Sequence, residues 1–305
     1  MDQSIRRGTL EMTAAMLVSG TVGWFVLVSG QPVNDVVFWR CVFGAATLLL
    51  ICVAMGFLKR GIMGWTGFAW AVVSGVAIVA NWILLFASYS RASIGIATAV
   101  YNTQPFMLVG LGALFLGERI TLDKILWLCM AFAGMLAVTG QHEAPSYGMG
   151  SYLAGIGLAL GAAFFYAVAA LLVKRLSGIP PHLIALIQVC TGVLLLAPLA
   201  DVGGWRAMPL ASWLSLAAMG IVHTGLVYVL LYGAIQRLPT ALTGALSFIY
   251  PIVAILVDRI AFAHQLGWLQ WLGVVAILAA AGGMRQGWRF TRLFRGRRSA
   301  PCLPR

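Results

Sequence analysis

Charged residues are scarce in this sequence. Asp, Glu, Lys and Arg together make up 9% of its 305 residues, whereas soluble domains carry about 25%. Hydrophobic residues make up 61% and the mean hydropathy is +0.95, so a soluble fold of this length could not bury its apolar surface. A spanning helix needs about 20 apolar residues and satisfies its own backbone polar groups, and the apolar runs here are too long for barrel strands. The sequence therefore predicts an all-α membrane protein.

Acidic residues are rarer still. Eight Asp and Glu stand against 20 Lys and Arg, which gives a net charge of +12. The basic residues are not interleaved with aromatic ones, and seven of them crowd the stretch from Arg285 to Arg305. We expect them to contact an anionic cytoplasmic leaflet, so membrane lipids are expected partners and nucleic acid is not.

Patterns for catalysis and metal binding are missing as well. The five cysteines are scattered and four lie in apolar runs, so neither a disulfide framework nor a zinc site is indicated. The sequence has no P-loop, no His-Glu-x-x-His and no Gly-x-Ser-x-Gly, which argues against ATP hydrolysis and an intramembrane enzyme. The sequence also lacks the repeated charges that could form a ring in a channel, so a channel is not favoured. We predict that the protein is not an enzyme and that it binds no cofactor and no metal ion.

Carboxylates are absent from the middle of the apolar runs. Glu11, Glu118 and Asp258 all fall near the ends of such runs. Many proton-coupled carriers use a carboxylate inside the membrane. Coupling of that kind is therefore not supported.

What the sequence does contain is a succession of ten apolar runs with short connections. Arg6 and Arg7 before the first run resemble a signal peptide, but further runs follow at once, so we interpret the first run as a retained helix. The runs cover about 10–29, 35–57, 65–89, 93–116, 122–140, 150–173, 182–199, 210–235, 240–258 and 265–285.

The basic residues predict the orientation of these runs. With a cytoplasmic N-terminus, sixteen Lys and Arg fall on the cytoplasmic side, and only Arg91, Arg206 and Arg259 fall on the other. This bias over short loops follows the positive-inside rule. We predict that both termini are cytoplasmic.

An internal repeat divides the chain. Residues 84–91 align with residues 230–237, an offset of 146 positions, and the same offset brings Pro105 onto Pro251 without a gap. Because each half holds five runs, an odd number, the second half must enter the membrane inverted, as in many secondary transporters. The predicted units are a first repeat (1–141), a linker (142–148), a second repeat (149–286) and a basic cytoplasmic tail (287–305).

The two matched prolines fall inside the fourth and ninth runs. Each removes an N–H group and frees the carbonyl four residues earlier, which is that of Tyr101 or Ser247. An ordinary kink would explain this, but the symmetric placement favours kinks that shape a central cavity. The small-residue pattern Gly157-x-x-x-Gly161 would in addition allow close sliding contacts between helices, and static packing explains it equally well.

Two segments carry a resemblance to a known family. Arg91-Ala92-Ser93 through Pro105, followed by Leu116-Gly117-Glu118-Arg119-Ile120-Thr121, resembles the signature of EamA-type carriers of the drug/metabolite transporter superfamily. The second half departs from this pattern, because His264 stands where the first half has Glu118.

The resemblance implies a basket of helices 1–4 and 6–9 around a central cavity, with helices 5 and 10 at the periphery. We expect the protein to work as a monomer. It implies alternating-access export of a small-molecule substrate across the bacterial inner membrane. The sequence is most similar to bacterial aromatic amino acid exporters, and a multidrug or other metabolite exporter of the same superfamily is the alternative.

Polar and aromatic side chains inside the runs are the candidate binding residues, because polar groups at membrane depth usually face a cavity or a partner. Tyr101 and Gln104 lie three residues apart, as do their repeat equivalents Ser247 and Tyr250. Packing or an interfacial belt is the alternative role for the aromatic residues. The predicted substrate-binding residues are Trp24, Asn81, Tyr101, Gln104, Phe165, Tyr166, His223, Tyr228, Ser247 and Tyr250, with Pro105 and Pro251 as kink residues.

Two further residues have competing interpretations. Arg40 could bind a substrate carboxylate, but its place about five residues into a run favours snorkelling to lipid phosphate. His223 could couple transport to protons, but a neutral, hydrogen-bonded imidazole is favoured.

Overall fold

The described part of the chain is helical throughout. The computed structural model describes residues 3–59, 61–92, 94–139, 149–200, 204–262 and 267–289, and no strand occurs among them. The predicted linker, most of the predicted tail and His264 lie outside these residues. The first half contains α1 (Gln3–Ser19), α2 (Val22–Ser29), α3 (Val33–Ala54), α4 (Trp65–Ala92), α5 (Ile94–Tyr101), α6 (Gln104–Leu116) and α7 (Leu122–Thr139).

The second half is less regular. It contains α8 (Met149–Arg175), α9 (Pro181–Leu196), the 3-10 helix η1 (Gly204–Ala207), α10 (Leu210–Ala218), the π-helix η2 (Met219–Leu226), α11 (Val227–Arg237), α12 (Thr240–Ser247), α13 (Ile249–Phe262) and α14 (Trp268–Gln286). α10, η2 and α11 form one continuous helical segment with a π-helical centre.

Helical segments lie over all ten apolar runs of the sequence, and seven stretches are long and apolar enough to cross a membrane. The residues 181–196 and 240–253 form shorter apolar helices. The seven stretches are Gln3–Val26, Val33–Ala54, Trp65–Ser88, Ala97–Leu116, Gly150–Arg175, Leu210–Arg237 and Trp268–Gln286. Lengths and compositions of this kind are those of a multi-pass membrane protein.

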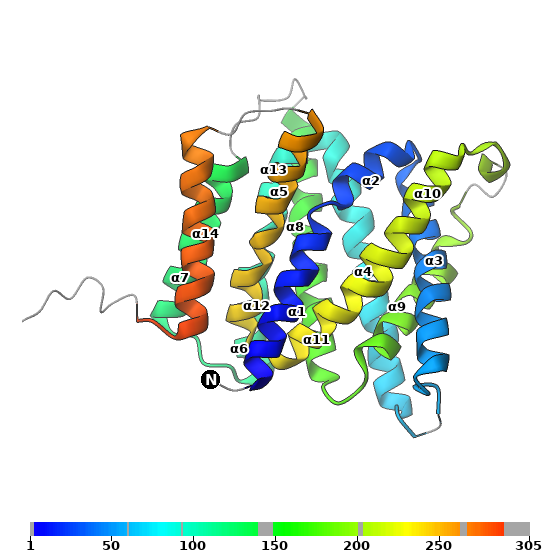
Figure 1. The fold of residues 1–305 in the computed structure, drawn as a ribbon, viewed down its shortest axis with the longest axis horizontal. Coiled ribbons are helices and arrows are strands. Elements are labelled where there is room, and N and C mark those ends of the chain that lie inside the picture. The colour runs from blue at the N-terminus through cyan, green and yellow to red at the C-terminus, as the bar shows by residue number, and fades with distance from the viewer. Residues whose placement is uncertain are drawn as a thin grey trace, which may run out of the picture.

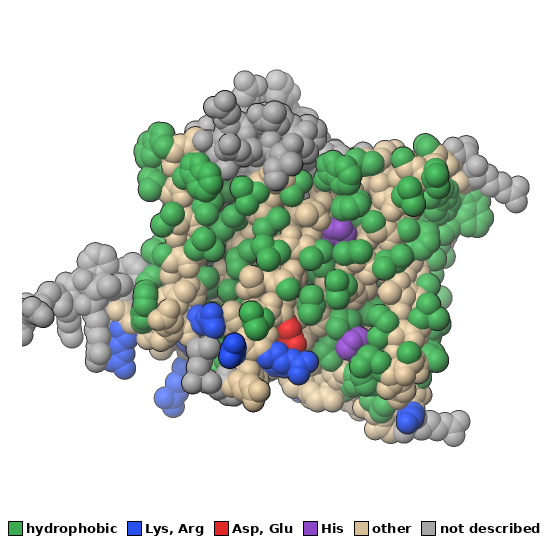
Figure 2. Space-filling model, in the orientation of Figure 1, with side chains coloured by type: hydrophobic (Ala, Val, Ile, Leu, Met, Phe, Trp, Pro, Cys, Tyr) green, Lys and Arg blue, Asp and Glu red, His purple; other side chains and the backbone are tan. Residues whose placement is uncertain are grey.

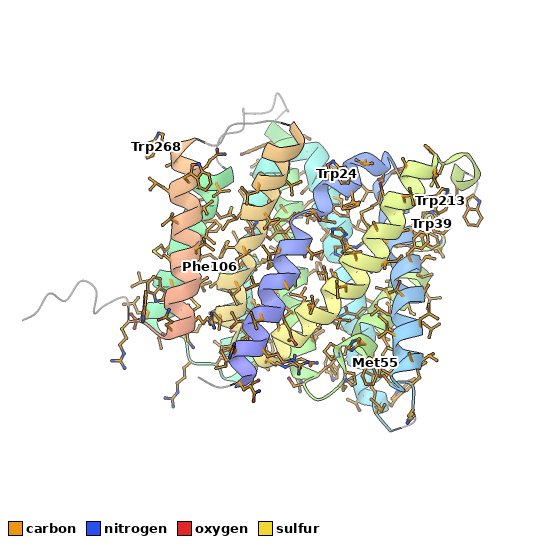
Figure 3. All side chains as sticks on the ribbon, in the orientation of Figure 1. Trp24, Trp39, Met55, Phe106, Trp213 and Trp268 are labelled. Atoms are coloured by element: carbon orange, nitrogen blue, oxygen red, sulfur yellow. The ribbon has the colours of Figure 1, made fainter. Side chains whose placement is uncertain are left out.

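The outer surface suits a lipid solvent. Large apolar side chains such as Leu50, Leu114 and Leu194 point outward and are 72%, 75% and 77% exposed. Figure 2 shows apolar side chains over most of one face, with the Lys and Arg side chains along its lower edge. Figure 3 shows four labelled tryptophans, Trp24, Trp39, Trp213 and Trp268, in the upper part of the same view. Basic residues at one edge and tryptophans near the other are typical of membrane interfaces.

Helices of the first half pair with helices of the second. α4 packs against α8, α1 against α11, α3 against α9, α6 against α12, and α7 against α14. The α7–α14 pair lies at one end of the bundle and the α3–α9 pair at the other (Figure 1). The core therefore lies between the halves, where the candidate site residues of both halves meet.

Close contacts between α3 and η2 depend on glycine. A Cβ added to Gly220 would lie 2.2 Å from the Cβ of Phe43 and 2.9 Å from the backbone nitrogen of Gly44. A Cβ at Gly44 would lie 2.8 Å from Thr224. The close contact predicted at Gly157 is wrong, because a Cβ there would meet open space.

We predict that Gly220→Ala lowers the stability of the protein by about 1–3 kcal/mol, since the added methyl group would force α3 and η2 apart. The measurement is the thermal unfolding temperature in detergent. Gly157→Ala is the matched control and should leave that temperature unchanged or raise it, because alanine favours helix. Equal unfolding temperatures for Gly220→Ala and the wild type would contradict the prediction.

Candidate functional site

Arg40 lies in the interior of the bundle, so the predicted snorkelling of its side chain is wrong. The residue is on α3 and is 7% exposed. Its Nε donates a hydrogen bond to the Thr224 hydroxyl at 2.7 Å, and its Nη2 donates to the His223 carbonyl at 3.3 Å. The guanidinium carbon lies 4.5 Å from the centre of the Trp82 ring and 5.8 Å from that of Tyr228. Arg40 is therefore enclosed by neutral acceptors and aromatic faces.

The π-helix η2 supplies the carbonyl that Arg40 uses. In an α-helix the His223 carbonyl would accept the N–H of Val227, four residues later. Here the Val227 N–H points to the carbonyls of Val222 and Thr224 instead. The His223 carbonyl is thus available to the guanidinium. π-helical turns are rare and recur at functional sites.

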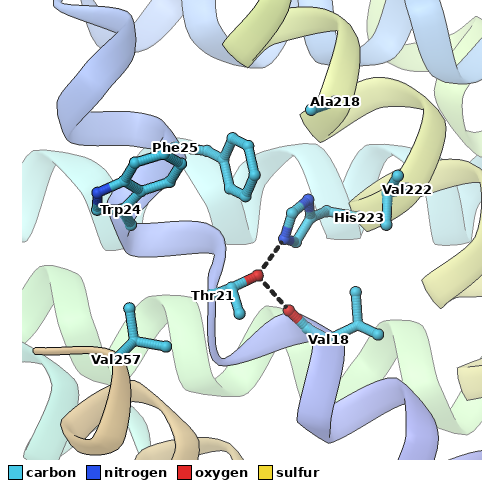
Figure 4. A pocket seen from close by; sticks show the side chains of 8 residues that line it. All are labelled: Val18, Thr21, Trp24, Phe25, Ala218, Val222, His223 and Val257. Carbon is cyan, nitrogen blue, oxygen red and sulfur yellow. Dashed lines mark hydrogen bonds between the residues drawn. The ribbon is translucent and has the colours of Figure 1, made fainter. Parts of the chain in front are cut away.

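The His223 side chain faces a cavity of about 400 Å³ on the other side of η2 (Figure 4). Its Nε2 lies 2.8 Å from the Thr21 hydroxyl, and that hydroxyl donates to the Val18 carbonyl at 2.8 Å. Because a hydroxyl has one hydrogen, Nε2 must donate to Thr21, and Nδ1 is then an acceptor. Nδ1 is buried and has no hydrogen-bond partner among the described residues.

The walls of this cavity are almost wholly apolar. Trp24, on α2, packs edge-on against Phe25, and Phe25 packs against the His223 ring with centroids 5.0 Å apart. A cavity of this size with one polar pair is suited to the apolar part of a small molecule. Its lining residues are Val18, Thr21, Trp24, Phe25, Ala218, Val222, His223 and Val257.

A second group of polar residues lies where α4, α8 and the α5–α6 segment meet. The Asn81 amide donates to the Ala162 carbonyl at 2.8 Å and to the Tyr101 hydroxyl at 3.3 Å. The Tyr101 ring stands edge-on to that of Tyr166, with centroids 6.2 Å apart. Gln104 lines a space of about 10 Å³ beside Tyr166, and its Oε1 is buried with no hydrogen-bond partner among the described residues. Such a space holds about one water molecule.

The helices on either side of this space are interrupted before the matched prolines. α5 ends at Tyr101 and α6 begins at Gln104, with Pro105 in its first turn. α12 ends at Ser247 and α13 begins at Ile249, two residues before Pro251. Ser247 lines the same small space as Gln104.

A hydrogen-bonded chain of three side chains connects α4, α9 and α11. Gln188 donates to the Ser74 hydroxyl at 2.5 Å and accepts a hydrogen bond from the Tyr232 hydroxyl. The Tyr232 ring lies edge-on to Tyr228, with centroids 5.1 Å apart. The chain therefore ends beside the aromatic faces that enclose Arg40.

The predicted binding residues do not converge on one cavity. Trp24 and His223 line the large cavity, Tyr228 encloses Arg40, and Phe165 and Tyr250 pack against the main core. Of the other predicted residues, Gln104, Tyr166 and Ser247 line the small space. Tyr101 contacts the Tyr166 ring, and Asn81 donates a hydrogen bond to Tyr101. The sequence analysis favoured lipid phosphate over substrate for Arg40, and it left Trp82, Gln188 and Tyr232 out of the predicted site, although Gln188 is conspicuous as a polar residue in an apolar run.

Ion pairs connect the halves at the basic edge of the molecule. Glu11 on α1 pairs with Arg237 at the end of α11, with 2.7 Å between the charged atoms. Glu118, after α6, pairs with Lys174 at the end of α8 at 3.0 Å. Glu118 also accepts hydrogen bonds from the Thr240 N–H and hydroxyl at 3.1 and 2.7 Å.

The surroundings of Glu118 favour its ionised form. Burial alone would raise the pKa of this carboxyl, but the hydrogen bonds from Thr240 and Lys174 and the charge of Lys174 hold the pKa below its ordinary value. The carboxylate therefore stabilises the folded state while it is ionised.

Comparisons with known proteins give one family for both halves. Residues 7–140 and 153–285 each match the EamA-like transporter family. The chain is 29% identical over 272 residues to the uncharacterized transporter YxxF of Bacillus subtilis, which covers 88% of this chain and 86% of YxxF. It is 28% identical over 240 residues to a probable terminal-alkyne amino-acid exporter of Streptantibioticus cattleyicolor, which covers 76% of this chain and 74% of the relative.

The fold is also known from solved structures. One crystal structure superposes with a TM-score of 0.79 at 19% identity, over 95% of this chain and 99% of that one. At this identity the likeness concerns the fold alone.

We predict that Glu118→Gln lowers the thermal unfolding temperature at pH 7 by about 2–4 °C, because it removes the charge that pairs with Lys174. The folded pKa lies below the unfolded one, so the stabilisation is present above the unfolded value and disappears as the pH falls through the folded value. The difference between wild type and variant should therefore shrink to zero in acid. Lys174→Met removes the other member of the pair. If the unfolding temperature of the double variant falls by the sum of the two single decreases, the two residues do not interact, and the pairing is contradicted.

Proposed function

Because the chain belongs to the EamA-like transporter family, we propose that it is a secondary transporter that exports neutral amino acids, aromatic ones above all, from the cell. The observation that carries the proposal is the cavity of about 400 Å³, which offers apolar and aromatic walls and a single imidazole–hydroxyl pair. The relative from Streptantibioticus cattleyicolor supports this substrate class, because it is described as a probable exporter of a terminal-alkyne amino acid. No motif for an enzyme accompanies the cavity in the sequence.

We further propose ten spans in two inverted halves of five, in a bacterial inner membrane with both termini cytoplasmic. Two separate matches to one family support the repeat. The pairing of α3 with α9 and of α7 with α14 supports a two-fold relation, because each pair joins equivalent helices of the two halves. The excess of Lys and Arg at one edge supports the orientation.

Transport would proceed by alternating access between the two halves. The Glu11–Arg237 and Glu118–Lys174 pairs join the halves at the edge that bears the basic residues, which is the cytoplasmic edge in the proposed orientation. The cavity, marked by Trp24, lies toward the other edge (Figure 3). This arrangement is that of a carrier closed toward the cytoplasm, and the inward-facing state would require both pairs to separate.

The substrate class can be tested with the purified protein in liposomes. We expect saturable uptake and counterflow with phenylalanine, tyrosine or tryptophan, because a carrier exchanges one bound molecule for another. Liposomes without protein are the control. Absence of counterflow with every aromatic and small aliphatic amino acid would overturn the proposed substrate class, and flux that never saturates would indicate a channel.

Gln104→Leu tests the second group of residues. Because Gln104 Oε1 has no hydrogen-bond partner among the described residues, the substitution should leave the unfolding temperature unchanged or raise it. Export should nevertheless fall about tenfold if the amide binds substrate or a water molecule on its path. The matched control is Gln188→Leu, which should lower stability because the Gln188 amide is bonded to Ser74 and Tyr232. Unchanged export by a well-folded Gln104→Leu protein would remove this group from the site.

A further inference from the structure

Arg40 is the buried basic residue of the described chain, and no carboxylate of the described residues pairs with it. The ion pairs of the described residues involve Arg7, Lys174 and Arg237, all toward the edge of the molecule. Arg40 is the buried Lys or Arg among the described residues, and only neutral groups contact it. A cation removed from water and left without a counter-charge is costly. This arrangement is expected where a counter-ion arrives as a ligand.

The guanidinium still has donors to offer. Its two hydrogen bonds occupy the Nε–H and one Nη2–H, out of the five N–H groups of an arginine. The guanidinium carbon lies over the Trp82 ring, 4.5 Å from its centre, and such a ring contact uses none of the N–H groups in a hydrogen bond to an oxygen. A carboxylate binds such an edge through two parallel hydrogen bonds.

Tyrosine rings of the second half lie near the same point. The Tyr228 ring centre is 5.8 Å from the guanidinium carbon, and the Tyr232 ring lies 5.1 Å from that of Tyr228. Both tyrosines come from α11, whereas Arg40 and Trp82 come from α3 and α4. A carboxylate there would contact a cation of the first half and lie beside Tyr228 of the second.

His223 connects this charge to the large cavity. Its backbone carbonyl accepts from Arg40, and its ring forms part of the cavity wall. The cavity and Arg40 therefore contact two parts of the same residue, the ring and the backbone carbonyl of His223. We propose that Arg40 is the anchor for the carboxylate of the transported molecule, so that the substrate class is amphiphilic carboxylates, a conclusion that rests on the transport function proposed above.

The test compares two probes that differ in one group. 3-Phenylpropionate carries a carboxylate, and 3-phenylpropanamide has the same ring and chain without the charge. Binding to the purified full-length protein in a neutral detergent is measured by calorimetry. We expect the wild type to bind the carboxylate at least about tenfold more tightly than the amide, and Arg40→Met to bind both about equally, with its affinity for the amide kept.

Arg175→Met is the matched control. The Arg175 guanidinium carbon also lies over a tryptophan ring, 5.5 Å from the centre of Trp70, but this residue is exposed at the end of α8. This variant should keep the preference for the carboxylate. If Arg40→Met does not fold, Arg40→Lys keeps the charge without the planar fork and should retain a reduced preference, and the wild-type comparison of the two probes decides by itself.

Several outcomes would overturn the anchor. These are equal binding of both probes by the wild type, no binding of either probe, or an equal loss of both probes in Arg40→Met, which would indicate a packing role. Competition by phosphatidylglycerol at the same site would identify the bound anion as a lipid headgroup and also overturn it. Flux measurements in liposomes separate this result from the proposed function: carboxylate binding without amino acid flux overturns export alone, and amino acid flux without a carboxylate preference overturns the anchor alone.

Discussion

A charge inside a bundle that lipid surrounds must be solvated by the protein itself, and the centre of this molecule is organised around that requirement. Arg40 donates hydrogen bonds to the Thr224 hydroxyl and the His223 carbonyl, and its guanidinium lies over the Trp82 ring. The carbonyl is free because η2 is π-helical, and the hydroxyl is near because Gly44 lets α3 approach Thr224 closely. The π-helix, the glycine contact and the aromatic cage are therefore three parts of the same electrostatic solution.

The other irregular backbone lies in the middle of the bundle as well. The interruptions after Tyr101 and Ser247 would each leave backbone groups without helical partners, and lipid could not satisfy them. At the second interruption a side chain takes part of that role, because the Ser247 hydroxyl donates to the Gly244 carbonyl at 2.7 Å. Helix breaks, polar side chains and the small space beside Gln104 consequently occur together.

Sequence reasoning could predict what depends on composition and short-range pattern. Apolar runs predict where helices lie, and Pro105 and Pro251 lie just after the observed interruptions. The prediction for Arg40 was wrong because counting residues along a run shows how far a residue lies from the end of its helix. It does not show which other helices cover the side chain. The partners of Arg40 are more than 180 positions away in sequence, and no residue pattern announces the π-helix that exposes one of them. Tyr232 was missed for the same reason, since its role depends on Gln188 of another helix.

The contacts around Arg40 and the ion pairs at the basic edge share one property. Both sets join residues of the first half to residues of the second. Arg40 belongs to the first half and Thr224 to the second, just as Glu118 belongs to the first and Lys174 and Thr240 to the second. A rocking motion of one half against the other would change both sets together. A carboxylate that binds Arg40 beside Tyr228 of the second half would therefore favour the arrangement in which these groups are close. Substrate binding would thereby shift the equilibrium between the two states. The size of the shift equals the difference between the substrate's binding free energies for the two states.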